Sequence, residues 1–207
     1  GYLDYSVPDV RAYMRRGWET IFREWGYDGL KLDFWTPGFE LREARFRGRD
    51  RTAIELRNLF LQDIRDFVPP GGYLLTCCTV NAGNPFLGRY ADASRMGQDV
   101  GDGTWTLAEM AATWVSVASL FYRNACLLPD PDSLGWCANM SEAENRLWAT
   151  LVLMVGGMCE IGGDLSRLAA AARRLLTRVA GLFGPCDKSA CEILGPGLGG
   201  LPGGLWR

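Results

Sequence analysis

Apolar residues in the first part of the chain follow a helical period and then change to an alternating one. The helical run starts after Ser6, where Pro8 and Asp9 mark a helix start, and ends at Gly26. Its apolar positions are Val10, Tyr13, Met14, Trp18, Ile21, Phe22 and Trp25. A short strand then follows from Leu30 to Phe34. Since strand side chains alternate between faces, the pattern predicts Leu30, Leu32 and Phe34 on one face and Lys31, Asp33 and Trp35 on the other.

The same change from helical to extended pattern recurs along the chain. Ser141 with Glu144 forms a capping box, the signature of a helix start. The pattern predicts helices over residues 52–68, 104–122, 141–155 and 166–182, and strands over 73–79, 91–94, 125–128 and 158–161. Strands that alternate with helices of this length predict parallel βαβ units and an α/β fold.

Both a closed (β/α)8 barrel and an open doubly wound sheet suit this alternation. Four aspartates, at positions 33, 99, 132 and 164, sit at or just after the ends of expected strands, where barrel enzymes gather catalytic groups. No glycine-rich phosphate loop follows the first strand, which disfavours the open sheet. A full barrel takes about 250 residues. We therefore expect a partial TIM barrel over residues 1–183, from about strand 3 to strand 8, and a Gly/Pro-rich tail or linker over 184–207.

Composition narrows the chemistry. The net charge of -2 and the scattered Lys and Arg residues disfavour nucleic acid as a partner and favour a neutral substrate. No apolar run is long enough to span a membrane, so the chain is expected to be soluble, with the cytoplasm favoured but not established. The absence of His removes the commonest neutral-pH base and most zinc sites. Seven cysteines without paired spacing read as mostly reduced, buried residues, and neither a metal nor a cofactor is expected.

The charged pair Lys31 and Asp33 is the first candidate for a site. Charges two residues apart on a strand usually mark a solvated face. Helices on both sides of this strand imply that neither face meets solvent, and a buried ion costs several kcal/mol unless it is paired or bound. A polar site explains the pair most simply.

Two later segments add further candidates. In "SRMGQDVGDGTW", residues 94–105, Arg95 and Asp99 precede a turn, and Asp102 reads as a helix cap. In "LPDPDSL", residues 128–134, Asp130 reads as a turn former and Asp132 as a ligand. Two other residues favour structural roles: Trp105 in the core and Asp164 as a cap.

These segments together resemble clan D glycoside hydrolases, the family 36 and family 27 α-galactosidases or melibiases, over about residues 2–183. "GYDGLKLDF" resembles the motif of a lysine two residues before the nucleophilic aspartate. "RMGQD" resembles the arginine followed by the acid/base aspartate. "DPDSL" and "GGDLSRL" resemble the segments after strands seven and eight. The resemblance places Lys31 and Asp33 on strand four, so that strands one, two and most of three are missing.

The resemblance implies a retaining mechanism. Asp33 would be the nucleophile and Asp99 the acid/base, with carboxyl groups about 5–5.5 Å apart. Arg95 would favour the ionised form of Asp99, so burial must offset it. Lys31, Arg95 and Asp132 would bind substrate; Trp35 offers an apolar wall for a sugar, with barrel packing equally open. The segment "CCTVNAGNP" departs from the pattern of both families, and Asn81 within it is a candidate sugar ligand.

The sequence therefore predicts a retaining α-galactosidase that hydrolyses terminal α-linked galactose in an oligosaccharide or galactoside. A galactosyl transglycosylase of the same fold and a non-catalytic barrel fragment stay open. A redox or metal site at Cys77 and Cys78 is the least favoured alternative. A homo-oligomer is compatible with the sequence, which does not fix the oligomeric state.

Overall fold

The computed structural model describes residues 2–40, 45–77, 85–95, 99–100, 127–134, 140–155, 157–162 and 165–183. The chain divides into two compact units, Gly1–Ala93 and Ser94–Arg207. The described strands, β1 (Gly29–Leu32), β2 (Tyr73–Thr76), β3 (Ala93–Arg95) and β4 (Leu128–Asp130), form one parallel sheet in this order, and helices lie between β1 and β2 along the chain. This arrangement confirms the predicted α/β class.

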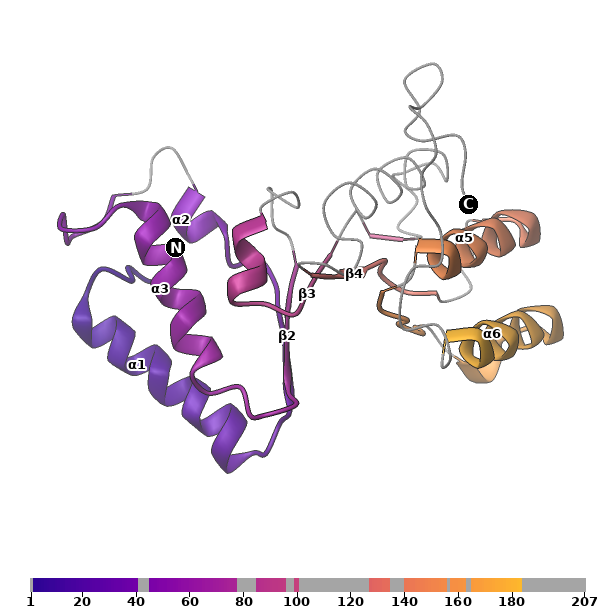
Figure 1. The fold of residues 1–207 in the computed structure, drawn as a ribbon, viewed down its shortest axis with the longest axis horizontal. Coiled ribbons are helices and arrows are strands. Elements are labelled where there is room, and N and C mark those ends of the chain that lie inside the picture. The colour runs from indigo at the N-terminus through magenta and orange to yellow at the C-terminus, as the bar shows by residue number, and fades with distance from the viewer. Residues whose placement is uncertain are drawn as a thin grey trace, which may run out of the picture. The chain divides into compact units, whose positions relative to one another are not determined.

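The described residues of the first unit form two strands and three α-helices (Figure 1). In chain order these are α1 (Pro8–Glu19), a π-helical turn (Thr20–Glu24), β1 (Gly29–Leu32), α2 (Pro37–Glu40), α3 (Ala53–Arg65), β2 (Tyr73–Thr76) and a 3₁₀ helix (Pro85–Arg89). Strands β1 and β2 pair in parallel, with Gly29 opposite Tyr73 and Leu32 opposite Thr76. A parallel pair needs a crossover connection, and α3 supplies it. The predicted βαβ unit is thus confirmed.

The starts of α1 and α3 differ in their capping hydrogen bonds. Helix α1 begins after Val7, which caps it without a side-chain hydrogen bond, while the hydroxyl of Ser6 donates to Asp4 at 2.6 Å. Helix α3 begins with a full capping box, in which Thr52 and Glu55 satisfy each other's backbone N–H groups. Ser6 is therefore close to the helix start that the sequence predicted, but it is not the capping residue.

Phe60 of α3 is the centre of the first unit's aromatic core. Its ring lies 5.2 Å from Tyr5, 5.9 Å from Trp35 and 6.0 Å from Trp18, measured between ring centroids. An aliphatic part of the core comes from one face of α3 and both faces of β2: Leu56, Leu61, Ile64, Leu74 and Leu75. Because β2 is apolar on both faces, it has the burial expected of an interior parallel strand.

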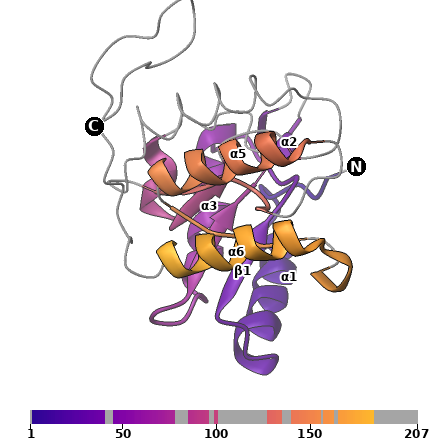
Figure 2. The same ribbon diagram turned by 90° about the vertical axis from the view of Figure 1, so that its right-hand side faces the viewer.

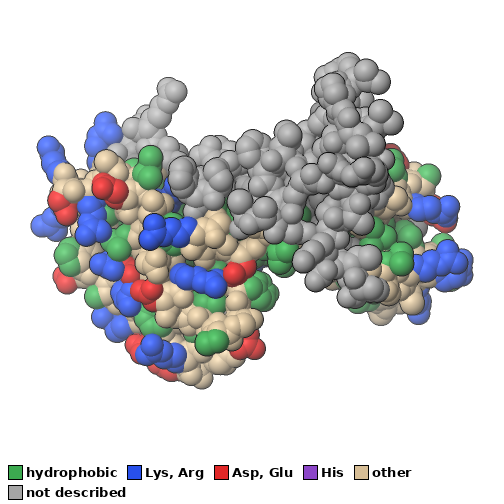
Figure 3. Space-filling view, viewed as in Figure 1, with side chains coloured by type: hydrophobic (Ala, Val, Ile, Leu, Met, Phe, Trp, Pro, Cys, Tyr) green, Lys and Arg blue, Asp and Glu red, His purple; other side chains and the backbone are tan. Residues whose placement is uncertain are grey.

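Asp63 is a fully buried carboxylate that ties α1 to α3. Oδ2 accepts hydrogen bonds from the Tyr5 hydroxyl at 2.6 Å and from Arg11 Nε at 2.5 Å. Oδ1 accepts from Arg11 Nη2 at 2.7 Å and from Arg15. Burial raises the pKa of Asp63, but the hydrogen bonds from Arg11, Tyr5 and Arg15 outweigh it, so the net pKa is below its ordinary value. Figure 3 shows arginine and acidic side chains interspersed over one face of this unit.

The described part of the second unit contains the other two strands and two long helices. Strand β3 (Ala93–Arg95) starts at the last residue of the first unit, and β4 (Leu128–Asp130) follows. Helices α5 (Glu142–Val155) and α6 (Ala170–Phe183) lie side by side (Figure 2), and a 3₁₀ turn (Leu165–Arg167) precedes α6. The capping box of Ser141 and Glu144 is confirmed, with Ser141 N–H donating to the Glu144 carboxylate at 2.7 Å.

Several predicted elements differ from the observed ones. The strands predicted over residues 30–34 and 73–79 end earlier, at Leu32 and Thr76. The strand predicted over residues 158–161 is a single parallel bridge between Ser133 and Glu160. The helix over residues 104–122 and the tail over 184–207 lie outside the described residues, so the domain boundary stays a prediction. In the part of the chain that the structure describes, no helix has the length and apolar character needed to cross a membrane.

Asp63→Asn should destabilise the protein by about 3 kcal/mol, because Arg11 and Arg15 lose the buried carboxylate with which they pair. The pKa of Asp63 is lowered in the folded state, so its contribution is present above the ordinary carboxyl pKa of about 3.9 and is lost as pH falls further. We therefore expect the stability difference between the wild type and Asp63→Asn to shrink below about pH 4. Urea unfolding at a series of pH values measures it.

Asp66→Asn is the matched control, since Asp66 is an exposed carboxylate one turn further along, 3.3 Å from Arg15. It should change the free energy of unfolding by less than about 1 kcal/mol. Equal losses for the two variants, or a pH-independent loss for Asp63→Asn, would contradict the role given to Asp63.

Candidate active site

Lys31 and Asp33 lie at the carboxyl end of β1, as predicted. Lys31 is within the strand and Asp33 follows its last residue, Leu32. The backbone N–H of Phe34 donates to Asp33 Oδ1 at 2.9 Å. Phe34 has a φ of 47°, a left-handed conformation that is uncommon for a bulky residue. The chain therefore turns sharply directly after Asp33.

The structure corrects the argument that first pointed to this pair. Lys31 and Asp33 are both exposed, whereas the sequence argument required that neither face of the strand meet solvent. The reason is the sheet order, in which β1 is the outermost strand and β2 the interior one. An edge strand can keep charges in water at little cost. The role of Lys31 and Asp33 in a site remains a prediction, and the cost of burying two charges no longer supports it.

Trp35 does not share a face with Lys31 and Asp33. The left-handed residue Phe34 ends the strand alternation, so that Phe34 is 68% exposed and Trp35 is buried at 7%. The Trp35 ring stacks on Phe60. This is the packing role that the sequence left open, and a sugar contact by Trp35 stays untested.

Arg95, at the end of β3, is the centre of a charged cluster within the second unit. Its side chain is only 8% exposed and faces three carboxylates. Nη1 donates to Asp99 at 2.8 Å, Nη2 to Asp132 at 2.9 Å, and Nε lies 3.3 Å from Asp130. A buried guanidinium is stable only when such partners offset its lost hydration. The structure thus brings together Arg95, Asp99 and Asp132, which the sequence predicted as site residues from separate segments.

Asp132 holds a second strained backbone position. Its φ is 68°, and it is the other non-glycine residue with positive φ in the described ranges. Its N–H donates to Asp130 Oδ1 at 2.7 Å, and its Oδ2 accepts from the N–H of Val100 at 2.7 Å. Aspartate adopts this conformation more readily than most residues because its short side chain makes local hydrogen bonds. Strained positions of this kind cluster at functional sites, and here both lie beside predicted site residues.

Asp99 is less enclosed than the sequence argument required. Its side chain is 71% exposed although it pairs with Arg95. The burial that was expected to offset Arg95 is therefore not observed, because Asp99 lies four residues beyond the end of β3 in an exposed position. Its role as acid/base stays a prediction.

Sequence reasoning missed the importance of Asp130. It was read as a turn former, yet its side chain is fully buried and contacts Arg95. The available signal was an arginine at the end of a short buried strand, which requires an acidic partner. Asn81, Asp102, Trp105 and Asp164 lie outside the described residues, so their predicted roles are not tested.

The thiols offer little for the alternative redox or metal reading. Cys77 is buried and Cys159 is half-buried, and neither forms a disulfide within the described residues. Cys78 lies outside those residues. Burial raises the pKa of the Cys159 thiol, which disfavours the reactive thiolate. In the described ranges no three His, Cys, Asp or Glu side chains group closely enough to hold a metal ion.

Comparison with known proteins gives structural likeness without sequence likeness. No protein-family model matches the chain, and no curated protein matches it. A Thermus thermophilus α-galactosidase in complex with stachyose matches with a TM-score of 0.61 and 20% identity, covering 86% of this chain. A family 27 β-L-arabinopyranosidase from Geobacillus stearothermophilus matches with a TM-score of 0.60 and 18% identity, covering 92%.

The fold of the chain is similar to that of family 27 and α-galactosidase catalytic domains over most of its length. A variant of the same arabinopyranosidase in complex with arabinose also matches, with a TM-score of 0.57, 18% identity and 89% of this chain covered. The chain spans less than half of these structures, 39%, 45% and 44% of their lengths. The likeness predicted from sequence is therefore confirmed for the fold, and the partial coverage is consistent with the predicted partial barrel.

Phe34→Gly should be more stable than Phe34→Ala by about 1 kcal/mol, because only glycine adopts positive φ without a steric cost. Elsewhere in a loop alanine is normally the more stabilising residue. Thermal or urea unfolding of the two variants measures the difference.

Gly71→Ala is the matched control for this backbone effect. Gly71 has a φ of 79°, and an added Cβ would meet nothing within 4 Å, so its loss of stability reports backbone strain alone. The strained turn after Asp33 is refuted if Gly71→Ala destabilises the protein but Phe34→Ala is at least as stable as Phe34→Gly.

Proposed function

We propose that this chain is part of a retaining α-glycosidase that hydrolyses terminal α-linked galactose. The observation that carries the proposal is the pairing of Arg95 with both Asp99 and Asp132 at the carboxyl ends of β3 and β4. That end of the strands is where barrel enzymes gather their catalytic groups. The fold likeness and the motif around Asp33 support the same reaction class.

The proposed reaction is a double displacement that needs two carboxyl groups. Asp33 attacks the anomeric carbon and forms a covalent glycosyl-enzyme bond, while Asp99 protonates the departing oxygen. Asp99 then removes a proton from water, which attacks the same carbon and releases Asp33. Lys31, next to Asp33 on β1, donates hydrogen bonds to sugar hydroxyls.

The other predicted contacts concern sugar recognition. Arg95 and Asp132, held together at 2.9 Å, present fixed donors and acceptors to hydroxyl groups. Asn81 and Trp35 are proposed as further contacts, although the buried position of Trp35 favours packing. The substrate is an oligosaccharide or galactoside, and no cofactor takes part.

A β-L-arabinopyranoside is the second candidate substrate, favoured by the fold likeness to a family 27 β-L-arabinopyranosidase. The two sugars share ring configuration and differ by the hydroxymethyl group of galactose. Transfer to a sugar acceptor rather than water uses the same two steps and remains an alternative. A non-catalytic role for the chain also remains, since it spans less than half of the matched structures.

Incubation with an activated 2-fluoro galactosyl donor should label Asp33. Fluorine at C2 slows both the formation and the hydrolysis of the glycosyl-enzyme intermediate. The activated leaving group restores only the rate of formation, so the intermediate accumulates. Peptide mass spectrometry locates the label. The matched arabinopyranosyl donor, used in parallel, distinguishes the two candidate sugars.

Asp33→Asn should abolish labelling, whereas Asp28→Asn, an exposed carboxylate five residues earlier, should retain it. A label on another residue would refute the nucleophile assignment. No label from either donor would favour the non-catalytic alternative.

Asp99→Ala should slow the cleavage of substrates with poor leaving groups much more than that of substrates with good ones. A poor leaving group needs a proton from Asp99, and general acid catalysis contributes about 10²–10⁴-fold, so its cleavage should fall by that factor. Cleavage of a galactosyl fluoride should fall far less. Steady-state rates on the two substrates measure this, with Asp132→Ala expected to lower both alike. An equal loss on both for Asp99→Ala would contradict its acid role.

A further inference from the structure

Asp130 has no part in the proposed chemistry, yet it is the most buried carboxylate around Arg95. Its side chain is 0% exposed, against 16% for Asp132 and 71% for Asp99. It is the last residue of β4 and lies between Pro129 and Pro131, which restrict the backbone on both sides. A carboxylate in this setting acts on its neighbours rather than on a ligand from solvent.

The two oxygens of Asp130 hold two different groups. Oδ2 faces Arg95 Nε at 3.3 Å, and Oδ1 accepts the backbone N–H of Asp132 at 2.7 Å. Nε joins the guanidinium to its aliphatic stem, so a partner at Nε fixes the plane in which Nη1 and Nη2 lie. Those two nitrogens then meet Asp99 and Asp132.

The contact with Asp132 fixes a backbone as well as a side chain. Asp132 has a φ of 68°, and the hydrogen bond to Asp130 favours that strained conformation. Without this acceptor, the N–H of Asp132 loses its partner and the left-handed turn loses its support. The Asp132 carboxylate, which pairs with Arg95, would then shift.

We propose that Asp130 is a positioning residue that sets the orientation of Arg95 and Asp132, and through Arg95 that of Asp99. The catalytic consequence of this assignment rests on the proposed function, but the structural part does not. Asp130 touches no substrate in this account, and its effect passes through the guanidinium and the backbone turn.

The structural part is tested by NMR of the Arg95 side chain. Its Nε–H signal, assigned by its absence in Arg95→Lys, should be protected from solvent exchange in the wild type. Asp130→Asn removes the charged acceptor with little change in shape, and the protected signal should be lost. A rapidly exchanging Arg95 Nε–H in the wild type would overturn the proposal even if the variant fails to fold.

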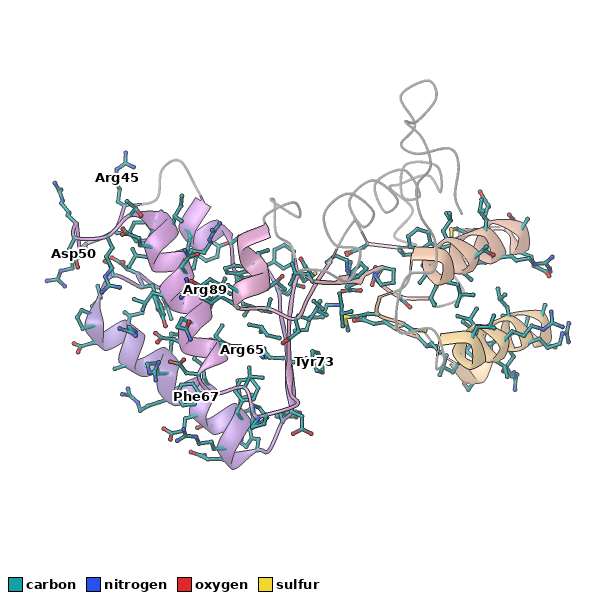
Figure 4. The ribbon with its side chains drawn as sticks, in the orientation of Figure 1. Arg45, Asp50, Arg65, Phe67, Tyr73 and Arg89 are labelled. Carbon is teal, nitrogen blue, oxygen red and sulfur yellow. The ribbon has the colours of Figure 1, made fainter. Side chains whose placement is uncertain are left out.

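Asp92→Asn is the matched control. Asp92 also joins an arginine to a backbone N–H, pairing with Arg65, labelled in Figure 4, and accepting from Leu74 at 2.9 Å. It lies at the other end of β3 and should leave the Arg95 signal unchanged. Loss of that signal in both variants would mean a general loosening and would overturn the specific role.

The catalytic part is tested by the rate at which the 2-fluoro donor labels Asp33. Misplacing a group by about 1 Å costs on the order of 10²-fold, so Asp130→Asn should slow labelling by that factor. Arg95→Lys keeps the charge but lacks Nε, and it should slow labelling similarly. Asp92→Asn should label at the wild-type rate.

The outcomes separate the two proposals. An unlabelled wild type whose Arg95 signal is lost in Asp130→Asn refutes the proposed function and leaves the positioning of Arg95 supported. Normal labelling of Asp130→Asn, with the Arg95 signal lost, overturns the catalytic consequence. An unchanged Arg95 signal in a folded Asp130→Asn overturns the assignment itself.

Discussion

A buried guanidinium must be surrounded by acceptors, and Arg95 imposes that requirement on the whole candidate site of the second unit. Its three nitrogens each face a different carboxylate, which draws the end of β3, the end of β4 and the segment at residues 99–100 together. Removing such a charge from its partners costs about 3–5 kcal/mol, so this geometry is held firmly. The carboxyl ends of parallel strands are where barrel enzymes place their active sites, so a rigid charged cluster here suits the proposed site.

The first unit is held together by a different buried charge and by an aromatic core. Asp63 is its buried charge, and it joins helices behind the sheet rather than groups at the strand ends. The aromatic core around Phe60 then leaves the end of β1 to turn sharply at Phe34, with Asp33 exposed. The packing of the helices and the aromatic core thus supports a strained, exposed turn at the end of β1.

Sequence alone predicted the elements whose signals are local. The Ser141 and Glu144 capping box and the parallel β1–β2 unit depend on neighbouring residues or on a clear period, and both are confirmed. Trp35 was placed on the wrong face because nothing in the alternating pattern announces the left-handed Phe34. The exposure of Lys31 and Asp33 follows from the edge position of β1, which is a tertiary property. Asp130 was missed since its partner lies 35 residues away in the chain.

The central claim of the proposed function is that the carboxyl groups of Asp33 and Asp99 act on a single sugar. The most direct measurement is a crystal structure of the protein with bound galactose, in which the separation of the Asp33 and Asp99 carboxyl groups is read. The account predicts about 5–5.5 Å, with the anomeric carbon between them. A separation beyond about 9.5 Å exceeds what either glycosidase mechanism uses and would contradict the account.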